Sequence, residues 1–134
     1  MRVEAVDIGH VHQVWPMVEK FIDSALKFSK GDYDTQAAKV LVSTGQWVLL
    51  VAVDDQGVHG AATASFHNRP NDRVAFITAI GGKLISSPET FAQLKQILSR
   101  YGATCIEGAA RDSIARLWTR YGFSEKYKIV GVSI

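Results

Sequence analysis

Two side chains that can exchange protons near neutral pH stand in or beside predicted strands. His67 follows a strand predicted over residues 58–66, and an imidazole is a common general base in enzymes. Glu107 lies among isoleucine, glycine and alanine in a strand predicted over residues 104–109. Apolar neighbours raise the pKa of a carboxyl group, as a general base requires. The alternatives are a surface histidine, and a glutamate that faces the solvent or pairs with an arginine.

The other nucleophilic and metal-binding side chains are few. The chain has one cysteine, Cys105, which excludes an intrachain disulfide and is interpreted as a small buried residue. His10 and His12 stand two residues apart at a predicted helix start, so their side chains face different directions. With no cysteine or carboxylate partner nearby, we expect no metal site.

A glycine-rich segment at residues 81–87 carries groups suited to phosphate. It contains two glycines, a lysine and two serines, and it directly precedes a predicted helix. Backbone N–H groups at a helix start bind anions, helped by the helix dipole. The alternative is a self-capped helix, with Ser87 as N-cap, Pro88 in the first position and Glu89 in the first turn.

The elements that position these residues follow from hydrophobic periodicity and turn signals. Three strands joined by short turns predict an antiparallel meander, and a helical connection makes the next strand parallel to the third. The order β-α-α-β-β-β-α-β-α-β predicts one α/β domain over residues 1–134, with a mixed, largely antiparallel sheet. The predicted strands are 2–8, 47–53, 58–66, 73–80, 104–109 and 123–134, and the helices are 10–26, 34–45, 87–100 and 112–121.

Composition agrees with a folded domain and excludes several classes. Of 134 residues, 47% are hydrophobic and 21% charged, with only three prolines, which is unlike a disordered or collagen-like chain. No apolar run reaches the ~18–20 residues that cross a bilayer, and the start lacks a secretory signal pattern. The net charge of +2 does not favour nucleic acid. We expect a cytoplasmic protein without a membrane partner.

This order of elements, in this length, resembles the GNAT superfamily of acetyl-CoA-dependent N-acetyltransferases over nearly the whole chain. The strongest local match is the end of the predicted helix 112–121, where Tyr121-Gly122-Phe123 leads into the last segment. Glycine accepts the left-handed conformation after a helix, and the phenylalanine fixes the next segment to the core. The resemblance implies the GNAT fold and acetyl transfer to a small amine or a protein amino group.

The resemblance also implies where acetyl-CoA lies. The pantetheine arm occupies the opening between the third meander strand and the next strand, and the pyrophosphate lies on the loop that follows. The family's Arg/Gln-x-x-Gly-x-Gly loop is not present, and Arg111 stands where an asparagine is common. Arg111 either pairs with a phosphate or is a solvated charge. The implied cofactor-binding residues are Thr78, Ile80, Gly81, Gly82, Lys83, Ser86, Ser87 and Arg111.

Catalysis in the family implies a base that frees the amine and an acid that protonates the departing thiolate. We assign Glu107 and His67 as candidates for the base. The family's helix tyrosine is replaced by Trp118, which is interpreted as a core aromatic because an indole is no proton donor of useful pKa. Tyr121 is then the candidate acid, and the alternatives are that Tyr127 replaces it or that no acid is used.

A second hypothesis follows from these departures from the family pattern. A GNAT-like domain without chemistry would serve as a binding or structural module, for example as a phage-encoded, virion-associated part. Self-association or a protein partner would then matter. The aliphatic side chains of Val130, Val132 and Ile134 predict a sheet edge for such contacts.

Overall fold

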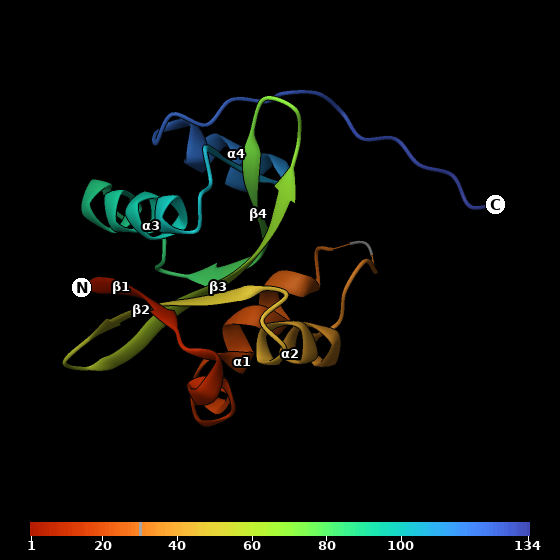
Figure 1. Ribbon diagram of the computed structural model, residues 1–134. Helices are drawn as coiled ribbons and strands as arrows, with labels where there is room; N and C mark the ends of the chain where they lie inside the picture. Colours follow the sequence, from red (N-terminus) through yellow and green to blue (C-terminus); the bar gives the residue numbers. More distant parts are fainter. Residues whose placement is uncertain (30) are drawn as a thin grey trace.

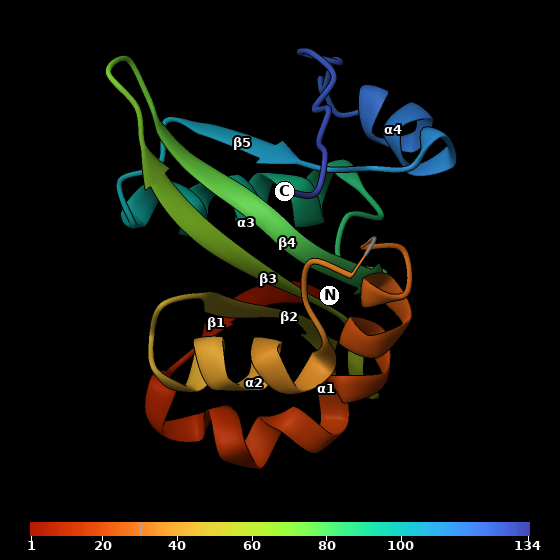
Figure 2. The same cartoon turned by 90° about the vertical axis from the view of Figure 1, so that its right-hand side faces the viewer.

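The computed structural model describes residues 1–29 and 31–134, and it has helices on both faces of one sheet (Figure 1). Helices α1 and α2 cover one face, and α3 covers the other together with α4 (Figures 1 and 2). The strands are β1 (Arg2–Val6), β2 (Val48–Asp54), β3 (Gly57–Asn68), β4 (Arg73–Gly82) and β5 (Cys105–Gly108). The helices are α1 (Val11–Leu26), α2 (Thr35–Ser43), α3 (Pro88–Arg100) and α4 (Asp112–Thr119), with a 3-10 turn at Ile8–His10.

The sheet has the order β1-β2-β3-β4-β5, in which each strand pairs with its neighbours in sequence. The first four strands are antiparallel, and β5 is parallel to β4. The predicted meander and the predicted parallel pair are therefore confirmed. The α/β class with a mixed, largely antiparallel sheet is confirmed with them.

Two hydrophobic clusters, one on each face of the sheet, hold the layers together. On one face the apolar stripe of α1, including Val18 and Ile22, packs with α2 over alternate residues of the strands. On the other face Leu94 of α3 and Trp118 of α4 pack on the intervening residues, such as Leu50. The side chains of each strand thus alternate between the two hydrophobic clusters.

Local signals place the helix starts as predicted. The Asp34 carboxylate accepts a hydrogen bond from the Ala37 N–H at 2.7 Å and so caps α2. Ser87 caps α3, with Pro88 in its first position. Within the described residues, no helix is both long enough and apolar enough to cross a membrane.

The predicted final strand over residues 123–134 is wrong. This segment has no strand structure, and it runs away from the body of the protein (Figure 1). Its alternating apolar side chains are typical of a strand, but a strand exists only where its backbone has a partner. The side chains of Val130 and Val132 are 90% and 93% exposed.

Candidate functional site

The two central strands of the site, β4 and β5, are paired only along the first half of β4. Their pairing runs from Val74 with Cys105 to Ile77 with Gly108, and β5 ends there. Strand β4 continues to Gly82, so none of the described strands pairs with the outer edge of residues 78–82. The predicted opening between the third meander strand and the next strand is therefore present.

A β-bulge lies where the two strands part. Thr63 of β3 pairs with Ala79, whereas the next residue, Ala64, pairs with Ile77, so Thr78 is the extra residue in β4. The Thr78 hydroxyl is hydrogen bonded to the buried Thr63 hydroxyl at 2.7 Å. A bulge changes which residues of a strand present their backbone groups to each side.

The bulge turns the backbone groups of Ile80 and Gly82 toward the free edge. Before the bulge, the Arg73 carbonyl accepts a hydrogen bond from the Thr104 N–H. The backbone N–H and C=O groups of Arg73, and of every second residue after it, therefore point toward β5. After the bulge, the Lys83 N–H donates to the His59 carbonyl of β3 at 2.9 Å. Backbone groups alternate between the two sides of a strand, so Lys83 and Gly81 direct theirs toward β3. The N–H and C=O of Ile80 are then directed away from β3 and are available to an extended ligand.

Close packing explains why glycines follow Ile80. A Cβ on Gly81 would lie 2.5 Å from the carbonyl oxygen of Phe21 in α1, and one on Gly82 would lie 2.4 Å from the carbonyl oxygen of His59. Gly82 also has a positive φ of 70°, which favours glycine. These two predicted cofactor residues thus have a structural role, whatever they bind.

The start of α3 is self-capped, which is the alternative given above for this segment. The Thr90 hydroxyl accepts from the backbone N–H groups of Ser86 and Ser87 at 3.3 and 3.2 Å, and the Ser87 hydroxyl accepts from the Thr90 N–H. Pro88 has no N–H to donate. The expected phosphate donors Ser86 and Ser87 are therefore engaged within the chain. Among these loop residues the exposed Lys83 ammonium is the group suited to a phosphate.

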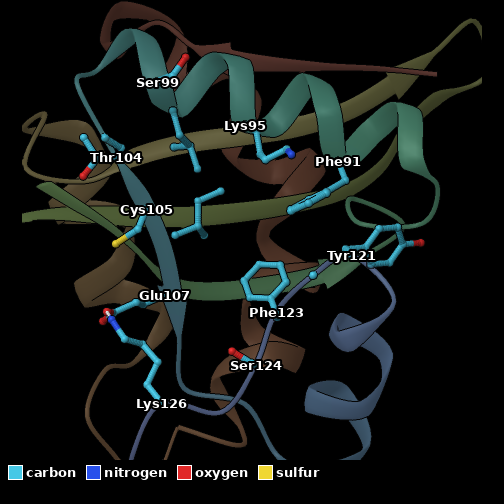
Figure 3. Close-up of a pocket in the computed structure, with 14 residues that line it drawn as sticks. Phe91, Lys95, Ser99, Thr104, Cys105, Glu107, Tyr121, Phe123, Ser124 and Lys126 are labelled. Atoms are coloured by element: carbon cyan, nitrogen blue, oxygen red, sulfur yellow. Dashed lines mark hydrogen bonds and ion pairs between the residues drawn. The ribbon is translucent and has the colours of Figure 1, made fainter. Parts of the chain in front are cut away.

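The expected raised pKa of Glu107 is wrong, and the alternative pairing with an arginine is what the structure shows. Arg69 donates to both carboxylate oxygens at 2.6 and 2.9 Å, and Lys126 lies 2.5 Å from one of them (Figure 3). These hydrogen bonds, first from Arg69 and then from Lys126, lower the pKa of Glu107 from 4.5 to about 2. A carboxylate held in this way is a weak base.

The Glu107 ion pairs predict a pH-dependent contribution to stability. Because the pKa of Glu107 is lower in the folded protein, its contribution is complete above pH 4.5 and is lost as pH falls toward 2. Glu107→Gln should lower the free energy of unfolding at pH 7 by about 1–3 kcal/mol. Urea unfolding at pH 7 and at pH 3 measures this, and the difference between variant and wild type should shrink at pH 3.

A matched control for this prediction is Glu125→Gln, because Glu125 is an exposed glutamate of the same chain. It should change the free energy of unfolding by less than about 0.5 kcal/mol at both pH values. Equal effects of Glu107→Gln at pH 7 and pH 3 would contradict the assignment of the low pKa to the ion pairs.

His67 and Glu107 lie on the same face of the sheet. Ser65, Phe76 and Glu107 form one row across β3, β4 and β5, and the Ser65 hydroxyl lies 3.0 Å from the His67 imidazole Nε2. However, His67 pairs with Val74, four residues before Thr78, which is roughly 13 Å along the strand. The histidine is exposed and lies away from the free edge of β4.

Tyr121 is separated from the other two catalytic candidates. Its ring packs on Phe91 of α3 at 5.4 Å between centroids, and it belongs to the core on the α3 face. Glu107 points to the opposite face, and the Tyr121 hydroxyl points away from it (Figure 3). The structure thus brings together no triad of Glu107, His67 and Tyr121.

Trp118 is a core residue, as interpreted from its helical spacing. It is 5% exposed, its ring lies 5.0 Å from that of Phe123, and it covers the backbone of Gly108 at the end of β5. A Cβ on Gly108 would lie 3.0 Å from the Trp118 ring. The position that the resemblance assigns to a proton donor is therefore filled by apolar packing.

Arg111 lies against an aromatic ring. It precedes α4, and its guanidinium lies 4.0 Å from the centroid of the Phe28 ring, just after α1. The contact links the segment after α1 to the start of α4, and Arg111 is exposed. An exposed guanidinium in such a cation–π contact keeps N–H donors for an anion.

Cysteine and metal chemistry have little support in this site. Cys105 lies in β5, where desolvation, followed by the Asp72 and Glu107 charges, raises the pKa of its thiol. A raised pKa lowers the thiolate fraction and hence nucleophilicity. Across residues 1–29 and 31–134, no group of three or more histidine, cysteine or acidic residues is arranged to hold a metal ion.

Sequence reasoning missed the partners of Glu107. Arg69 lies in the hairpin between β3 and β4, 38 residues before Glu107, and Lys126 lies after α4. No spacing pattern connects these three residues. The strand register places Glu107 beside Phe76, near that hairpin, and the path of the chain after α4 brings Lys126 to the same carboxylate.

Comparison with known proteins supports the fold through structure and not through sequence. No family model and no curated protein sequence matches the chain. A solved probable acetyltransferase superposes with a TM-score of 0.70 at 13% identity, covering 100% of this chain and 98% of its own. The fold is that of the GNAT acetyltransferases.

Two other solved structures with the GNAT fold hold coenzyme A groups. AAC(6')-Iy in complex with the bisubstrate analogue CoA-S-monomethyl-acetylneamine superposes with a TM-score of 0.67 at 15% identity, covering 98% of this chain and 96% of its own. A predicted acetyltransferase from Clostridium acetobutylicum, solved with acetyl-CoA, has a TM-score of 0.63 at 13% identity, covering 98% of this chain and 94% of its own. At these identities the likeness establishes the fold.

Proposed function

We propose that the protein is an N-acetyltransferase that binds acetyl-CoA along the free edge of β4 and transfers its acetyl group to an amine. The observation that carries the proposal is the opening at the bulge, where Ile80 presents an N–H and a C=O that β3 does not use. The pantetheine arm contains amide groups that can pair with such an edge as an added strand would. Two solved structures with this fold contain coenzyme A groups, which supports the same ligand class.

The residues present fit one part of acetyl-CoA better than another. The free edge of residues 78–82 fits an extended amide-bearing arm, and the Lys83 ammonium fits a phosphate. The self-capped start of α3 leaves Ser86 and Ser87 without spare N–H groups, so phosphate binding rests on Lys83 and on Arg111. We infer a cofactor held mainly by the strand edge.

Acetyl transfer from a thioester to an amine requires few proton transfers from the side chains of this protein. Acetyl-CoA supplies a thioester carbonyl that an unprotonated amine attacks. The N–H groups at the free edge of β4 would stabilise negative charge on the carbonyl oxygen. His67 lies on the face of the sheet where an amine would enter, and because it lies away from the free edge it would accept the amine's proton through intervening water. With Trp118 buried, the thiolate would leave without a proton from that helix.

The same face of the sheet offers a route for the acceptor. A small amine or a protein amino group would approach past His67 and the Glu107–Arg69 pair, where the hairpin between β3 and β4 is exposed. A solved aminoglycoside acetyltransferase of the same fold in complex with sisomicin supports a small amine. We propose a small amine as the first acceptor class to test.

The test is a thermal-shift titration with acetyl-CoA followed by a thiol-release assay over a panel of amines. At ~100 times the dissociation constant, acetyl-CoA should stabilise the protein by about 2.7 kcal/mol. No stabilisation at millimolar acetyl-CoA would overturn the proposal. It would also favour the alternative of a GNAT-like binding module without chemistry.

A substitution at the free edge sharpens this test. Ile80→Pro removes the N–H that points to the opening while leaving the β3–β4 ladder intact, because proline is tolerated where the N–H faces an open edge. We expect the dissociation constant for acetyl-CoA to rise by about tenfold or more, and tenfold is equivalent to about 1.4 kcal/mol. Ile80→Val keeps the N–H and is the matched control, which should bind as wild type does. Equal binding by both variants would exclude the edge as the binding site.

A further inference from the structure

Arg69 and Lys126 form a cationic patch on the face of the sheet beside the opening. Both side chains bind the carboxylate of Glu107, whose oxygens lie 2.6 and 2.9 Å from the Arg69 nitrogens and 2.5 Å from the Lys126 nitrogen. Figure 3 shows Lys126 reaching this carboxylate from the segment after α4. Within residues 1–29 and 31–134, neither cation pairs with a second acidic residue. Two positive charges thus share one negative charge, and the patch keeps a net positive charge.

The ion pairs leave both cations with hydrogen-bond donors to spare. A guanidinium has five N–H groups and an ammonium has three. Glu107 takes two from Arg69 and one from Lys126, and no other side chain or backbone oxygen of the described residues takes the rest. The Arg69 and Lys126 side chains are 40% and 50% exposed, so solvent reaches them. An anion that arrives from solvent can therefore bind here without displacing Glu107.

The remaining donors of Arg69 have the geometry that a carboxylate needs. Glu107 binds the two terminal nitrogens of the guanidinium, Nη1 and Nη2. The edge of the guanidinium that contains Nε then keeps two parallel N–H groups, which match the two oxygens of a second carboxylate. The nearby His67 imidazole is either neutral or positive, so it does not repel an anion.

The patch lies close to the site proposed for acetyl transfer. Glu107 pairs with Phe76, which stands two residues before Thr78 at the bulge. Two residues of a strand span about 7 Å. Thr63 lies two residues before Ser65, which shares a row with Phe76, so Thr63 and Phe76 are on one face. Thr78 is hydrogen bonded to the Thr63 hydroxyl, and its side chain is therefore on the face of the patch.

We propose that the acceptor is an amine that also carries a carboxylate, which Arg69 and Lys126 bind; this inference rests on the proposed acetyl transfer. With the amine at the opening and the carboxylate at the patch, a chain of roughly four to six carbons separates them. The carboxylate takes no part in the chemistry. The amine nitrogen forms the amide bond, the thioester C–S bond breaks, coenzyme A leaves as the thiolate, and the amine's proton passes through water to His67. A polyamine would place an ammonium against the patch and bind less well.

Three matched acceptors test the charge at the end of the chain opposite the amine. They are an ω-amino acid of this length, its ω-amino amide and the corresponding diamine, which carry a carboxylate, a neutral amide and an ammonium. The thiol-release assay at saturating acetyl-CoA gives kcat/KM for each. We expect the acid to be preferred over the amide and the amide over the diamine, with at least about tenfold between acid and diamine. Equal values, or a preference for the diamine, would overturn the inference.

Arg69→Gln removes the guanidinium charge and tests the patch itself. The ratio of kcat/KM for the acid to that for the amide should fall by at least about fivefold, and Arg69→Lys should retain part of the preference. A purely structural role of Arg69 would not change this ratio, because a loss of folded protein affects both acceptors equally. An unchanged ratio in Arg69→Gln would count against the patch as the carboxylate site.

Arg100→Gln is the matched control for the loss of one positive charge. Arg100 is exposed at the end of α3, which covers the opposite face of the sheet. Its charge is screened from the patch by distance and salt, so the acid-to-amide ratio should stay within about twofold of the wild-type value. An equal fall of the ratio in Arg100→Gln and Arg69→Gln would mean that overall charge sets the preference, and would overturn the assignment to Arg69.

Calorimetry separates the failure of this inference from the failure of the proposed function. The three acceptors are titrated into protein saturated with coenzyme A, which has no acetyl group to transfer. The dissociation constant should be lowest for the acid and highest for the diamine, and added salt should narrow the difference. If neither coenzyme A nor acetyl-CoA binds, the proposed function is wrong and this inference falls with it. If acetyl-CoA binds and the diamine binds as tightly as the acid, this inference alone is wrong.

Discussion

Trp118→Ala is expected to lower the free energy of unfolding by about 3–5 kcal/mol. The ring is 5% exposed, stacks with Phe123, and lies directly on the backbone of Gly108 at the end of β5. Removing it leaves a cavity between α4 and the sheet that the rigid strand cannot close. Urea unfolding followed by circular dichroism measures the change.

Leu117→Ala is the matched control for this prediction. Leu117 is the preceding residue in α4, but it is 37% exposed. We expect a loss of about 1 kcal/mol or less. Similar losses for the two variants would show that α4 does not dock through Trp118. Trp118→Tyr should not raise the rate of the acetyl transfer that we propose, because its hydroxyl would lie in the same apolar packing.

Gly81→Ala should lower the free energy of unfolding by at least about 1–3 kcal/mol, although it adds only a methyl group. Its Cβ would lie 2.5 Å from the backbone oxygen of Phe21. Backbone cannot rotate away as a side chain can, so α1 must shift from β4. Thermal unfolding without any ligand is the appropriate measurement, because it separates this packing role from a role in cofactor binding.

Gly131→Ala is the control for the added methyl group. A Cβ on Gly131 meets nothing within 4 Å, so the free energy of unfolding should change by less than about 0.5 kcal/mol. If Gly81→Ala were as stable as wild type without ligand and lost only acetyl-CoA binding, the close packing of α1 on β4 would be contradicted.

The separation of β4 from β5 links the fold to the proposed chemistry. The bulge at Thr78 reverses which residues direct their backbone groups away from β3, and β5 ends at Gly108, so no described strand pairs with residues 78–82 on that side. Trp118 covers Gly108 from the α3 side. The packing of Trp118 on the sheet therefore lies at the end of β5, next to the edge that we propose binds acetyl-CoA.

Much of the fold was predictable because its signals are local. Apolar spacing predicts α1 and α3, and the sequence Ser87-Pro88-Glu89 marks the start of α3 through local capping alone. Short turns predicted the meander, and a helical connection predicted the parallel strand. The one wrong element is the final strand, because the pattern of residues 123–134 describes side chains and says nothing about a partner backbone.

The candidate site was predictable only in part. Thr78 and Ile80 were assigned from the resemblance, and both lie at the free edge. Glu107 was given a raised pKa because its sequence neighbours are apolar, whereas its neighbours in space are Arg69 and Lys126. A pKa depends on charges within a few ångströms, whatever their distance along the chain.

By itself the sequence determined the order of the elements, the faces of the helices and the caps, since each depends on residues within a few positions of one another. Only the tertiary structure decided that Glu107 is an ion-pair partner, that Gly81 is a point of contact with α1, and that residues 123–134 pair with none of the described strands. These facts depend on distances between residues far apart in sequence, which sheet register and helix docking set.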